Sequence, residues 1–261
     1  MPGLLKHITC YALDMDGTVY LGDTWIDGAR EFLAALDAAG KQYVFLTNNS
    51  SKGVAAYVEK LARMGLGVTA EKIVTSGQAT IRFLKREFPG QKVYLLGNEL
   101  LSAEFTAAGI ALCDSVPEVV VVGFDTSLDY VKMVKVCDFV RAGLPYVSTH
   151  PDLNCPVEGG YIPDAGAIHA FIHASTGRWP DYIIGKPNSE IVDFMLERMG
   201  AMRNETAMVG DRLYTDVAAG VSNGLTGILV LSGEATMADV DGAEVQPHFV
   251  FASLKEMIGE I

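Results

Sequence analysis

The sequence has little that would place the chain in a membrane or in an oxidising compartment. No apolar run approaches the ~18 residues of a membrane-spanning helix, and residues 1–7 lack the apolar segment of a secretory signal. The four cysteines are widely spaced and form no CxxC pair, so neither a disulfide framework nor a zinc cage is indicated. We therefore expect reduced thiols and a soluble, cytoplasmic protein.

Positive charge is also scarce. The chain has 20 Lys and Arg against 32 Asp and Glu, which gives a net charge of −12. This balance argues against nucleic acid or an anionic membrane as the main partner. An anionic small molecule stays compatible with it, because a bound metal can reverse the local sign of charge. Hydrophobic and charged fractions of 49% and 20% are those of a globular protein, and 261 residues suffice for two domains.

The most informative stretch is Asp14-Met15-Asp16-Gly17-Thr18, which follows the apolar run 8–13. The run predicts a buried strand. Two carboxylates at its end repel each other and lose hydration, which raises the pKa of one of them unless they share a cation or a proton. The pattern suits a metal site in which one carboxylate attacks and the other moves a proton. Taken alone, it is also compatible with an ordinary strand-to-turn junction, where Gly17 and Thr18 would shape the turn.

Strands and helices alternate without hairpin signals in the first part of the chain. A short irregular piece is predicted between Thr18 and Asp27, together with strands at 43–46 and 73–75 and helices over 28–39 and 54–65. This alternation indicates a parallel sheet with helices on both faces, in which ligands bind at the carboxyl ends of the strands. The polar cluster Thr47-Asn48-Asn49-Ser50 lies at such an end, although Ser50 or Ser51 also suits a helix cap.

Two further strand ends carry charged residues. Gly185-Lys186-Pro187 follows a predicted strand at 182–184, and Gly210-Asp211, with Asp216 five residues later, follows one at 207–209. A lone lysine or aspartate there would most often be solvated or a helix cap. Four strand ends that offer Asp-x-Asp, Thr-Asn, Lys and Asp together favour a catalytic site. The remaining predicted elements are helices at 189–199 and 215–223, strands at 227–231 and 249–251, and a C-terminal helix.

The middle of the chain, from about 79 to 180, alternates in the same way but lacks an acidic strand end. Strands at 93–96, 119–124 and 146–148 and helices at 100–108 and 128–142 are predicted. The stretch 150–166, rich in Pro and Gly, is predicted to be irregular, and long loops of this kind are usually functional. We interpret 79–180 as an inserted α/β domain that shapes a site formed by a core of residues 1–78 and 181–261.

These four strand ends, in this order, resemble the haloacid-dehalogenase superfamily in its phosphatase form. The insert resembles the type-C2 cap of the NagD-like, or 4-nitrophenylphosphatase-like, subgroup. The resemblance covers essentially the whole chain and implies a Rossmann-like parallel sheet core with an inserted α/β cap. Pro163-Asp164-Ala165-Gly166 is similar to a Pro-Gly-x-Gly segment of many members, but Asp164 replaces the first glycine. That departure concerns substrate choice and leaves the reaction unchanged.

The resemblance implies a Mg²⁺-dependent phosphatase that hydrolyses small phosphomonoesters, such as sugar phosphates, nucleoside monophosphates or, in vitro, 4-nitrophenyl phosphate. Asp14 is then the nucleophile that forms an aspartyl-phosphate. Asp16 acts as general acid and then as base, with its backbone carbonyl on the metal. Asp211 supplies a further carboxylate to Mg²⁺, and Asp216 orients these groups. The phosphoryl oxygens are expected to contact Thr47, Asn48 and Lys186.

The cap loop is expected to select the leaving group, with His150, Asn154 and Asp164 as polar candidates. A phosphomutase or phosphotransferase is the closest alternative, because it shares every core residue and differs mainly in the cap. A receiver domain is about half as long and lacks the second acid, a silent binding module would lose one of the four strand-end groups, and a dehalogenase needs neither Asp16 nor a metal. Family members often pair through the cap, so the resemblance also admits a homodimer.

Overall fold

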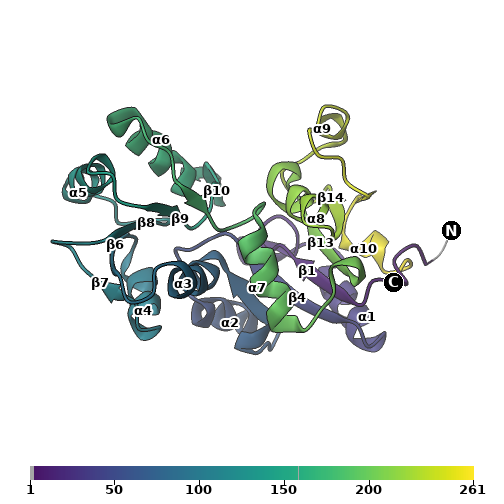
Figure 1. The fold of residues 1–261 in the computed structure, drawn as a ribbon. Helices are drawn as coiled ribbons and strands as arrows, with labels where there is room; N and C mark the ends of the chain where they lie inside the picture. The colour runs from purple at the N-terminus through teal and green to yellow at the C-terminus, as the bar shows by residue number, and fades with distance from the viewer. Residues whose placement is uncertain (1–2, 158) are drawn as a thin grey trace. The chain divides into compact units, whose positions relative to one another are not determined.

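The chain divides into two compact units in the computed structural model, which describes residues 3–157 and 159–261. Unit 1 comprises the described residues up to Thr47 together with Val58–Val74 and Lys186–Ile261 (Figure 1). Unit 2 comprises the described residues of Asn48–Tyr57 and Thr75–Gly185. This grouping differs from the predicted division at residues 48–57, 75–78 and 181–185.

Unit 1 is built on a six-stranded sheet with the strand order β15-β14-β13-β1-β4-β5. Strand β1 pairs in parallel with β13 and β4, and the pairs β13–β14 and β14–β15 are also parallel. Every residue of β1 and β13 is buried, as expected for central strands covered on both faces. The strands are β1 (Cys10–Leu13), β4 (Gln42–Thr47), β5 (Ile73–Thr75), β13 (Thr206–Gly210), β14 (Thr226–Val230) and β15 (Phe249–Phe251).

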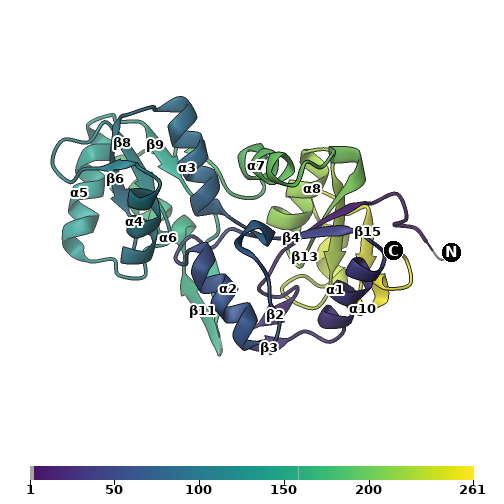
Figure 2. The same ribbon diagram turned by 90° about the horizontal axis from the view of Figure 1, so that it is seen from below.

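Helices cover this sheet on both sides, as the sequence predicted. Figure 2 shows α7 (Ser189–Met199) and α8 (Ala218–Ser222) on one side of the sheet and α1 (Ala29–Ala38) and α10 (Leu254–Met257) on the other. Helix α1 buries Phe32, Leu33 and Leu36, which recur at helical spacing. The remaining helices outside unit 2 are α2 (Val54–Arg63), which crosses the division between the units, and α9 (Met237–Asp241), which the sequence did not predict.

The order of the strands creates one special position in the sheet. The chain runs from β1 through β4 to β5 toward one edge, and from β13 through β14 to β15 toward the other. Strands β1 and β13 are neighbours, with Leu13 opposite Val209. In open α/β sheets, ligands bind at the carboxyl ends of the strands where the order reverses in this way. The residues that follow β1 and β13 therefore lie at the position that such sheets use for a site.

Two local predictions for unit 1 were wrong. Residues 20–25, expected to be irregular, form the short hairpin β2 (Tyr20–Leu21) and β3 (Thr24–Trp25). The helix predicted over 215–223 starts instead as a π-helical turn, Leu213–Val217, which α8 continues. In this turn the Val217 N–H donates to the Arg212 carbonyl at 3.1 Å. A π-turn inserts one extra residue into a helix and is frequent at functional sites.

Unit 2 contains a second sheet with the order β12-β9-β8-β6-β7, all of whose pairs are parallel. Helices α5 and α6 cover one face and α3 and α4 the other (Figure 1). The core joins residues of both layers, among them Leu96, Val122, Val136 and Ile172. The strands are β6 (Lys92–Leu96), β7 (Ala111–Leu112), β8 (Val119–Val122), β9 (Tyr146–Ser148) and β12 (Tyr182–Ile183), and the helices are α3 (Ser76–Glu87), α4 (Glu99–Ala107), α5 (Tyr130–Arg141) and α6 (Ala165–Thr176).

Strand β12 was predicted to belong to the core sheet, but it pairs with β9 of unit 2, with Ile183 opposite Ser148. Its Tyr182 ring also packs against Phe83 and Phe88, with centroids 5.2 and 6.0 Å away. At the other junction, the Ser50 Oγ accepts from the Phe124 N–H at 2.9 Å. These contacts with distant residues explain why residues on both sides of the predicted boundaries group with unit 2.

The stretch 150–166 was predicted to be irregular, and this prediction is wrong for part of it. It contains the antiparallel hairpin β10 (Asn154–Val157) and β11 (Gly160–Pro163), which lies outside the larger sheets. Prolines in both strands argue against a central strand, but a two-stranded hairpin has two free edges where a missing N–H is tolerated. Gly159, at φ +82°, supplies the left-handed residue that its turn requires.

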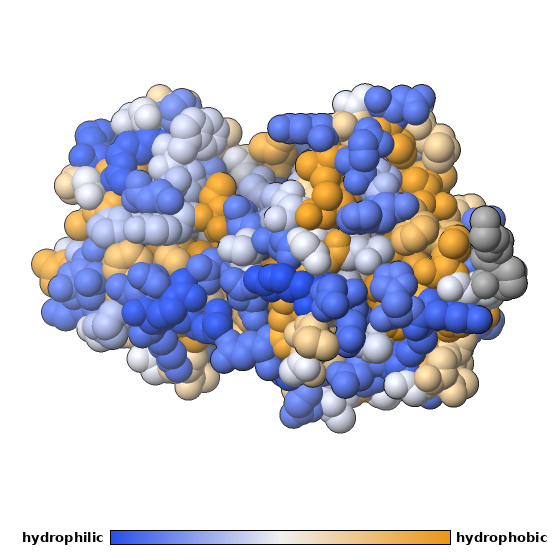
Figure 3. Space-filling view, turned by 45° about the vertical axis from the view of Figure 1, so that its right-hand side comes forward, coloured by the Kyte–Doolittle hydropathy of each residue, from blue (hydrophilic) through white to orange (hydrophobic). Residues whose placement is uncertain are grey.

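The described surface carries exposed apolar side chains, such as Leu21, Val116 and Trp179. On the face drawn in Figure 3, hydrophilic and hydrophobic side chains alternate in small groups, and scattered exposed apolar residues are ordinary on protein surfaces. Among the residues that the structure describes, no helix has both the length and the apolar character needed to cross a membrane.

The close packing of α8 on β14 leads to a prediction of stability. A Cβ on Gly220 would lie 2.7 Å from the Gly227 Cα, a backbone atom that cannot turn away. We expect Gly220→Ala to lower the free energy of unfolding by about 1–2 kcal/mol, because overpacking outweighs the better helix propensity of alanine. Denaturant unfolding measures this change. Gly242→Ala is the matched control, since its Cβ would meet open space; equal stability of the two variants would contradict the packing argument.

Candidate active site at the carboxyl ends of β1 and β13

The turn after β1 carries two partly exposed carboxylates. Met15 is fully buried, whereas Asp14 and Asp16 on either side of it are partly exposed. The turn is closed by the Gly17 N–H, which donates to the Tyr20 carbonyl at 2.8 Å. Gly17 has φ +93°, a conformation that glycine adopts without strain.

Asp211, which follows β13, lies against this turn. A Cβ on Gly17 would be only 2.4 Å from the Asp211 Oδ2, so glycine is needed for space as well as for conformation. The Thr18 hydroxyl lies 3.4 Å from the Asp211 Oδ1. The pairing of β1 with β13 thus brings Asp211 next to the turn that carries Asp14, although these two aspartates are almost 200 positions apart in the sequence.

Lys186 is the positive charge of the site and is almost completely buried. Its Nζ donates to the Asp14 Oδ1 at 2.5 Å, the Asp216 Oδ1 at 2.7 Å and the Leu46 carbonyl at 3.0 Å. Burial lowers the pKa of this ammonium, but the facing carboxylates outweigh burial and raise the pKa above its ordinary value. Lys186 therefore stays charged and joins the ends of β1 and β4 to the π-turn that carries Asp216.

Carboxylates outnumber cations at this position. Asp14, Asp211 and Asp216 each offer an oxygen within 4.8 Å of the other two, and Lys186 balances only one of the three charges. Burial, followed by repulsion from Asp14, raises the pKa of Asp211 to about 6. Burial likewise raises the pKa of Asp216. Such a group of hard oxygen donors with excess negative charge fits a divalent cation such as Mg²⁺.

Within that group, Asp216 differs from the other two. Its Oδ1 accepts from Lys186 and its Oδ2 accepts from the Arg212 N–H at 3.1 Å. A Cβ on Gly210 would lie 2.2 Å from the Asp216 Cγ, so the carboxylate occupies the space that this glycine leaves. Both oxygens of Asp216 thus already have donors, which agrees with an orienting part rather than direct ligation.

The two polar residues after β4 fall into different units. Thr47 ends β4 in unit 1 and is buried, whereas Asn48 belongs to unit 2. The Asn48 carbonyl accepts from the Ser76 hydroxyl at the start of α3. The expected contacts of Thr47 and Asn48 with a phosphoryl group stay predictions.

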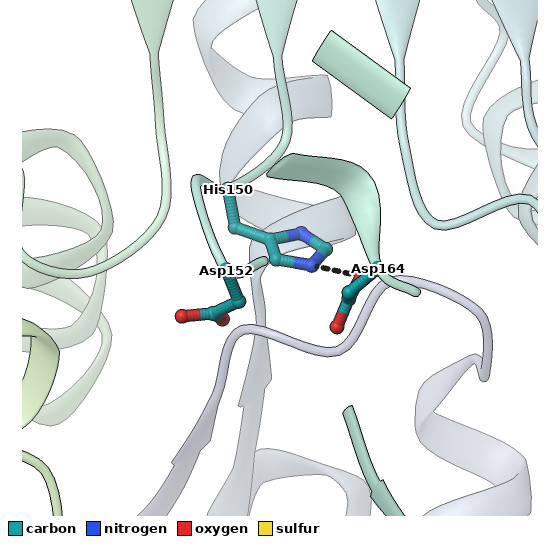
Figure 4. Close-up of side chains that lie close together, drawn as sticks. All are labelled: His150, Asp152 and Asp164. Atoms are coloured by element: carbon teal, nitrogen blue, oxygen red, sulfur yellow. Dashed lines mark hydrogen bonds and ion pairs between the residues drawn. The ribbon is translucent and has the colours of Figure 1, made fainter. Parts of the chain in front are cut away.

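The cap candidates lie around β10 and β11 in unit 2 and differ in exposure. His150 is fully buried: its Nε2 is 2.8 Å from the Asp164 Oδ1, and its Nδ1 is 2.8 Å from the Thr149 Oγ1 (Figure 4). Asp164 also caps α6, because its Oδ1 accepts from the Ala165 N–H at 2.6 Å. Asn154 is exposed. Two of the three candidates therefore stabilise the loop, and Asn154 alone presents its side chain to solvent.

His150, Asp152 and Asp164 form a second group with metal-ligand spacing. Their geometry does not favour a metal. Both ring nitrogens of His150 already face hydrogen-bonding partners, and Figure 4 shows the Asp152 carboxylate directed away from the other two side chains. The His150–Asp164 contact is better described as a buried hydrogen bond that fixes the two ends of the loop to each other.

The segment after β14 was missed by the sequence analysis. The Ser232 Oγ donates to the Gly17 carbonyl at 2.9 Å, and the Glu234 N–H donates to the Asp211 Oδ2 at 2.8 Å. This segment also follows a parallel strand, so the rule that drew attention to the other strand ends applied to it as well. It was overlooked because its main contact is made by a backbone N–H, which leaves no trace in residue type.

Known proteins resemble this chain over nearly its whole length. Residues 11–111 match the haloacid dehalogenase-like hydrolase family, and residues 183–257 match the family described as HAD-hydrolase-like. A protein of Staphylococcus aureus named acid sugar phosphatase is 37% identical over 258 residues, which cover 98% of this chain and 99% of that protein.

Solved structures agree with this assignment. The 4-nitrophenylphosphatase of Thermotoga maritima is 46% identical, with a TM-score of 0.94 and 98% of each chain covered. NagD of Escherichia coli K-12 is 35% identical, with a TM-score of 0.87 and coverage of 95% of this chain and 98% of that one. With its predicted fold confirmed and its relatives matched over nearly the whole chain, the chain belongs to the haloacid dehalogenase-like hydrolases, in the NagD-like subgroup that its inserted domain indicated.

Proposed function

We propose that the protein is a Mg²⁺-dependent phosphatase that hydrolyses small phosphomonoesters through an aspartyl-phosphate on Asp14. The observation that carries the proposal is the position of the Asp14 carboxylate, which Lys186 holds at 2.5 Å beside Asp211 at the switch point of the sheet. The names of the relatives support the reaction class, because they include an acid sugar phosphatase and a 4-nitrophenylphosphatase.

The metal would be held by the Asp14 and Asp211 carboxylates and by the Asp16 backbone carbonyl. When bound, Mg²⁺ would neutralise the phosphoryl oxygens and so remove their repulsion toward an anionic nucleophile. Asp211 offers its Oδ1 for this purpose, since its Oδ2 already accepts from Glu234. The charge balance also fits, because the three carboxylates and the one lysine of this group leave two negative charges, which one divalent ion would balance.

Asp14 attacks the phosphorus and forms the aspartyl-phosphate, while the leaving oxygen departs with a proton from Asp16. Asp16 then removes a proton from the water that attacks the phosphorus, which releases inorganic phosphate and regenerates Asp14. The lysine ammonium stays protonated because of its two carboxylate neighbours, so it acts as a fixed charge on the phosphoryl oxygens. Thr47 and Asn48 are proposed to donate further hydrogen bonds to the same oxygens.

Unit 2 is proposed to act as the cap that selects the leaving group, and phosphotransfer to a second substrate remains the alternative reaction. Of the three polar candidates, Asn154 is proposed to contact the substrate, because its side chain is exposed. His150 and Asp164 act on substrate choice indirectly, by fixing the loop between them. We further propose that the protein acts in the cytoplasm and, like its family, can pair through this unit.

The nucleophile is tested by Asp14→Asn. We expect this variant to fold and to have no turnover of 4-nitrophenyl phosphate, because an amide cannot form the phosphoenzyme. The wild type should likewise lose turnover in excess EDTA and regain it with Mg²⁺. Asp23→Asn, a change at an exposed turn, is the control and should keep full activity. Full activity of Asp14→Asn, or of the wild type in EDTA, would overturn the proposal.

The role of Asp16 is separated from metal binding by a second variant. If Asp16 transfers protons and ligates only through its backbone, Asp16→Asn should still bind Mg²⁺ while steady-state turnover falls by about 10²–10⁴. Isothermal titration of Mg²⁺ into Asp16→Asn and Asp211→Ala gives the comparison. An equal loss of Mg²⁺ binding in both variants would show that the Asp16 side chain is itself a ligand.

Substrate choice is tested by Asn154→Ala, with Asn204→Ala at an exposed position of unit 1 as the matched control. We expect Asn154→Ala to change kcat/KM unequally across a panel of sugar phosphates and nucleotides, and to affect 4-nitrophenyl phosphate least. The core residues are untouched, so hydrolysis itself should persist. A uniform effect on all esters, or none beyond that of the control, would remove Asn154 from substrate recognition.

A further inference from the structure

The segment 231–235, which we call the β14 strap, lies directly against Asp211. Three hydrogen bonds hold it there: Ser232 Oγ to the Gly17 carbonyl at 2.9 Å, Glu234 N–H to the Asp211 Oδ2 at 2.8 Å, and Ala235 N–H to the Asp211 carbonyl at 3.1 Å. The Glu234 N–H orients the Asp211 carboxylate. The other two hydrogen bonds fix the strap to the backbone of Gly17 and of Asp211.

The Glu234 side chain ties the strap to the segment that follows Asp211. Its Oε2 lies 2.8 Å from the Arg212 Nε, and its Oε1 accepts from the Tyr214 hydroxyl at 3.0 Å. Both partners lie within three residues of Asp211 in the chain. These contacts oppose a shift of the strap away from the carboxylate.

The carboxylate of Asp211 is enclosed by two glycines. A Cβ on Gly233 would lie 2.0 Å from the Asp211 Oδ2, and one on Gly17 would lie 2.4 Å from the same atom. Gly17 needs its positive φ, but Gly233 has no such conformation, so an alanine backbone would be tolerated there. The absence of a side chain at Gly233 therefore serves the position of the Asp211 carboxylate.

We infer that the β14 strap is a positioning element for the cation site, and that Gly233 and the Glu234 N–H together fix which Asp211 oxygen is presented. The Oδ2 accepts from the strap at 2.8 Å, whereas the Oδ1 faces the Thr18 hydroxyl at the longer distance of 3.4 Å. Asp211 is thus set to ligate through a single oxygen. The inference rests on the proposed metal site and adds to it the residues that orient its buried ligand.

Metal binding in the absence of substrate tests the strap. Mn²⁺, counted by electron paramagnetic resonance of the free ion, is titrated into the full chain and its variants. We expect Gly233→Ala to raise the Kd for Mn²⁺ by about 10-fold or more, the usual effect of disturbing a group that orients a ligand. Ser232→Ala adds no bulk and should raise the Kd by a smaller factor. Gly242→Ala, whose Cβ meets open space, should leave the Kd unchanged.

The free energy of unfolding of each variant is also measured in EDTA. A general loss of stability would lower this free energy but would not by itself change the Kd of the folded protein for Mn²⁺. If Gly233→Ala does not fold, Ser232→Ala decides the question alone. A wild-type Kd in every folded strap variant, with binding still lost in Asp211→Ala, would overturn the strap and leave the proposed function intact. Equal Mn²⁺ binding by the wild type and Asp211→Ala would instead overturn the metal site, and the strap inference with it.

Discussion

The buried contact of Lys186 with Asp14 and Asp216 is the interaction on which the site depends. An ammonium that is 2% exposed must be matched by close carboxylates, because leaving one member of a buried pair without its partner costs about 3–5 kcal/mol. The same ammonium also donates a hydrogen bond to the carbonyl of Leu46 near the end of β4. The Lys186 side chain therefore connects two neighbouring strands and the π-turn. Its charge also reduces the repulsion among the aspartates, and a bound cation would reduce this repulsion further.

Space for these acids is made by glycines. Ideal Cβ atoms on Gly17, Gly210 and Gly233 would each lie within 2.0 to 2.4 Å of an aspartate carboxyl atom. The carboxylates of Asp211 and Asp216 thus occupy space that these glycines leave open. There they lie close to the backbone N–H donors of Glu234 and Arg212. Unit 2 buries polar groups as well. Its buried His150 and Asp164 form a hydrogen bond with each other. Burial lowers the pKa of the neighbouring His169 to about 3, so that this ring stays neutral.

Most of the fold could be predicted because its central strands are continuous apolar runs that end in polar residues. The runs before Asp14 and Asp211 could only be buried parallel strands, and parallel strands place their carboxyl ends at one edge. The errors lie where local pattern and long-range pairing disagree. The prolines of β10 and β11 hid a hairpin, and the strand at Tyr182 looked like a core strand although it pairs with Val147.

By itself the sequence determined the family, the parallel core and the positions of Asp14 and Asp211 after the ends of core strands, because residue type and strand order carry that information. Only the tertiary structure decided that Asp216 shares the lysine, that His150 is buried, that Asn48 belongs to unit 2, and that a backbone N–H of the β14 strap holds Asp211. The physical reason is the same in each case. These contacts join atoms that are distant in the chain and, in the strap, groups that every residue possesses, so no local pattern could reveal them.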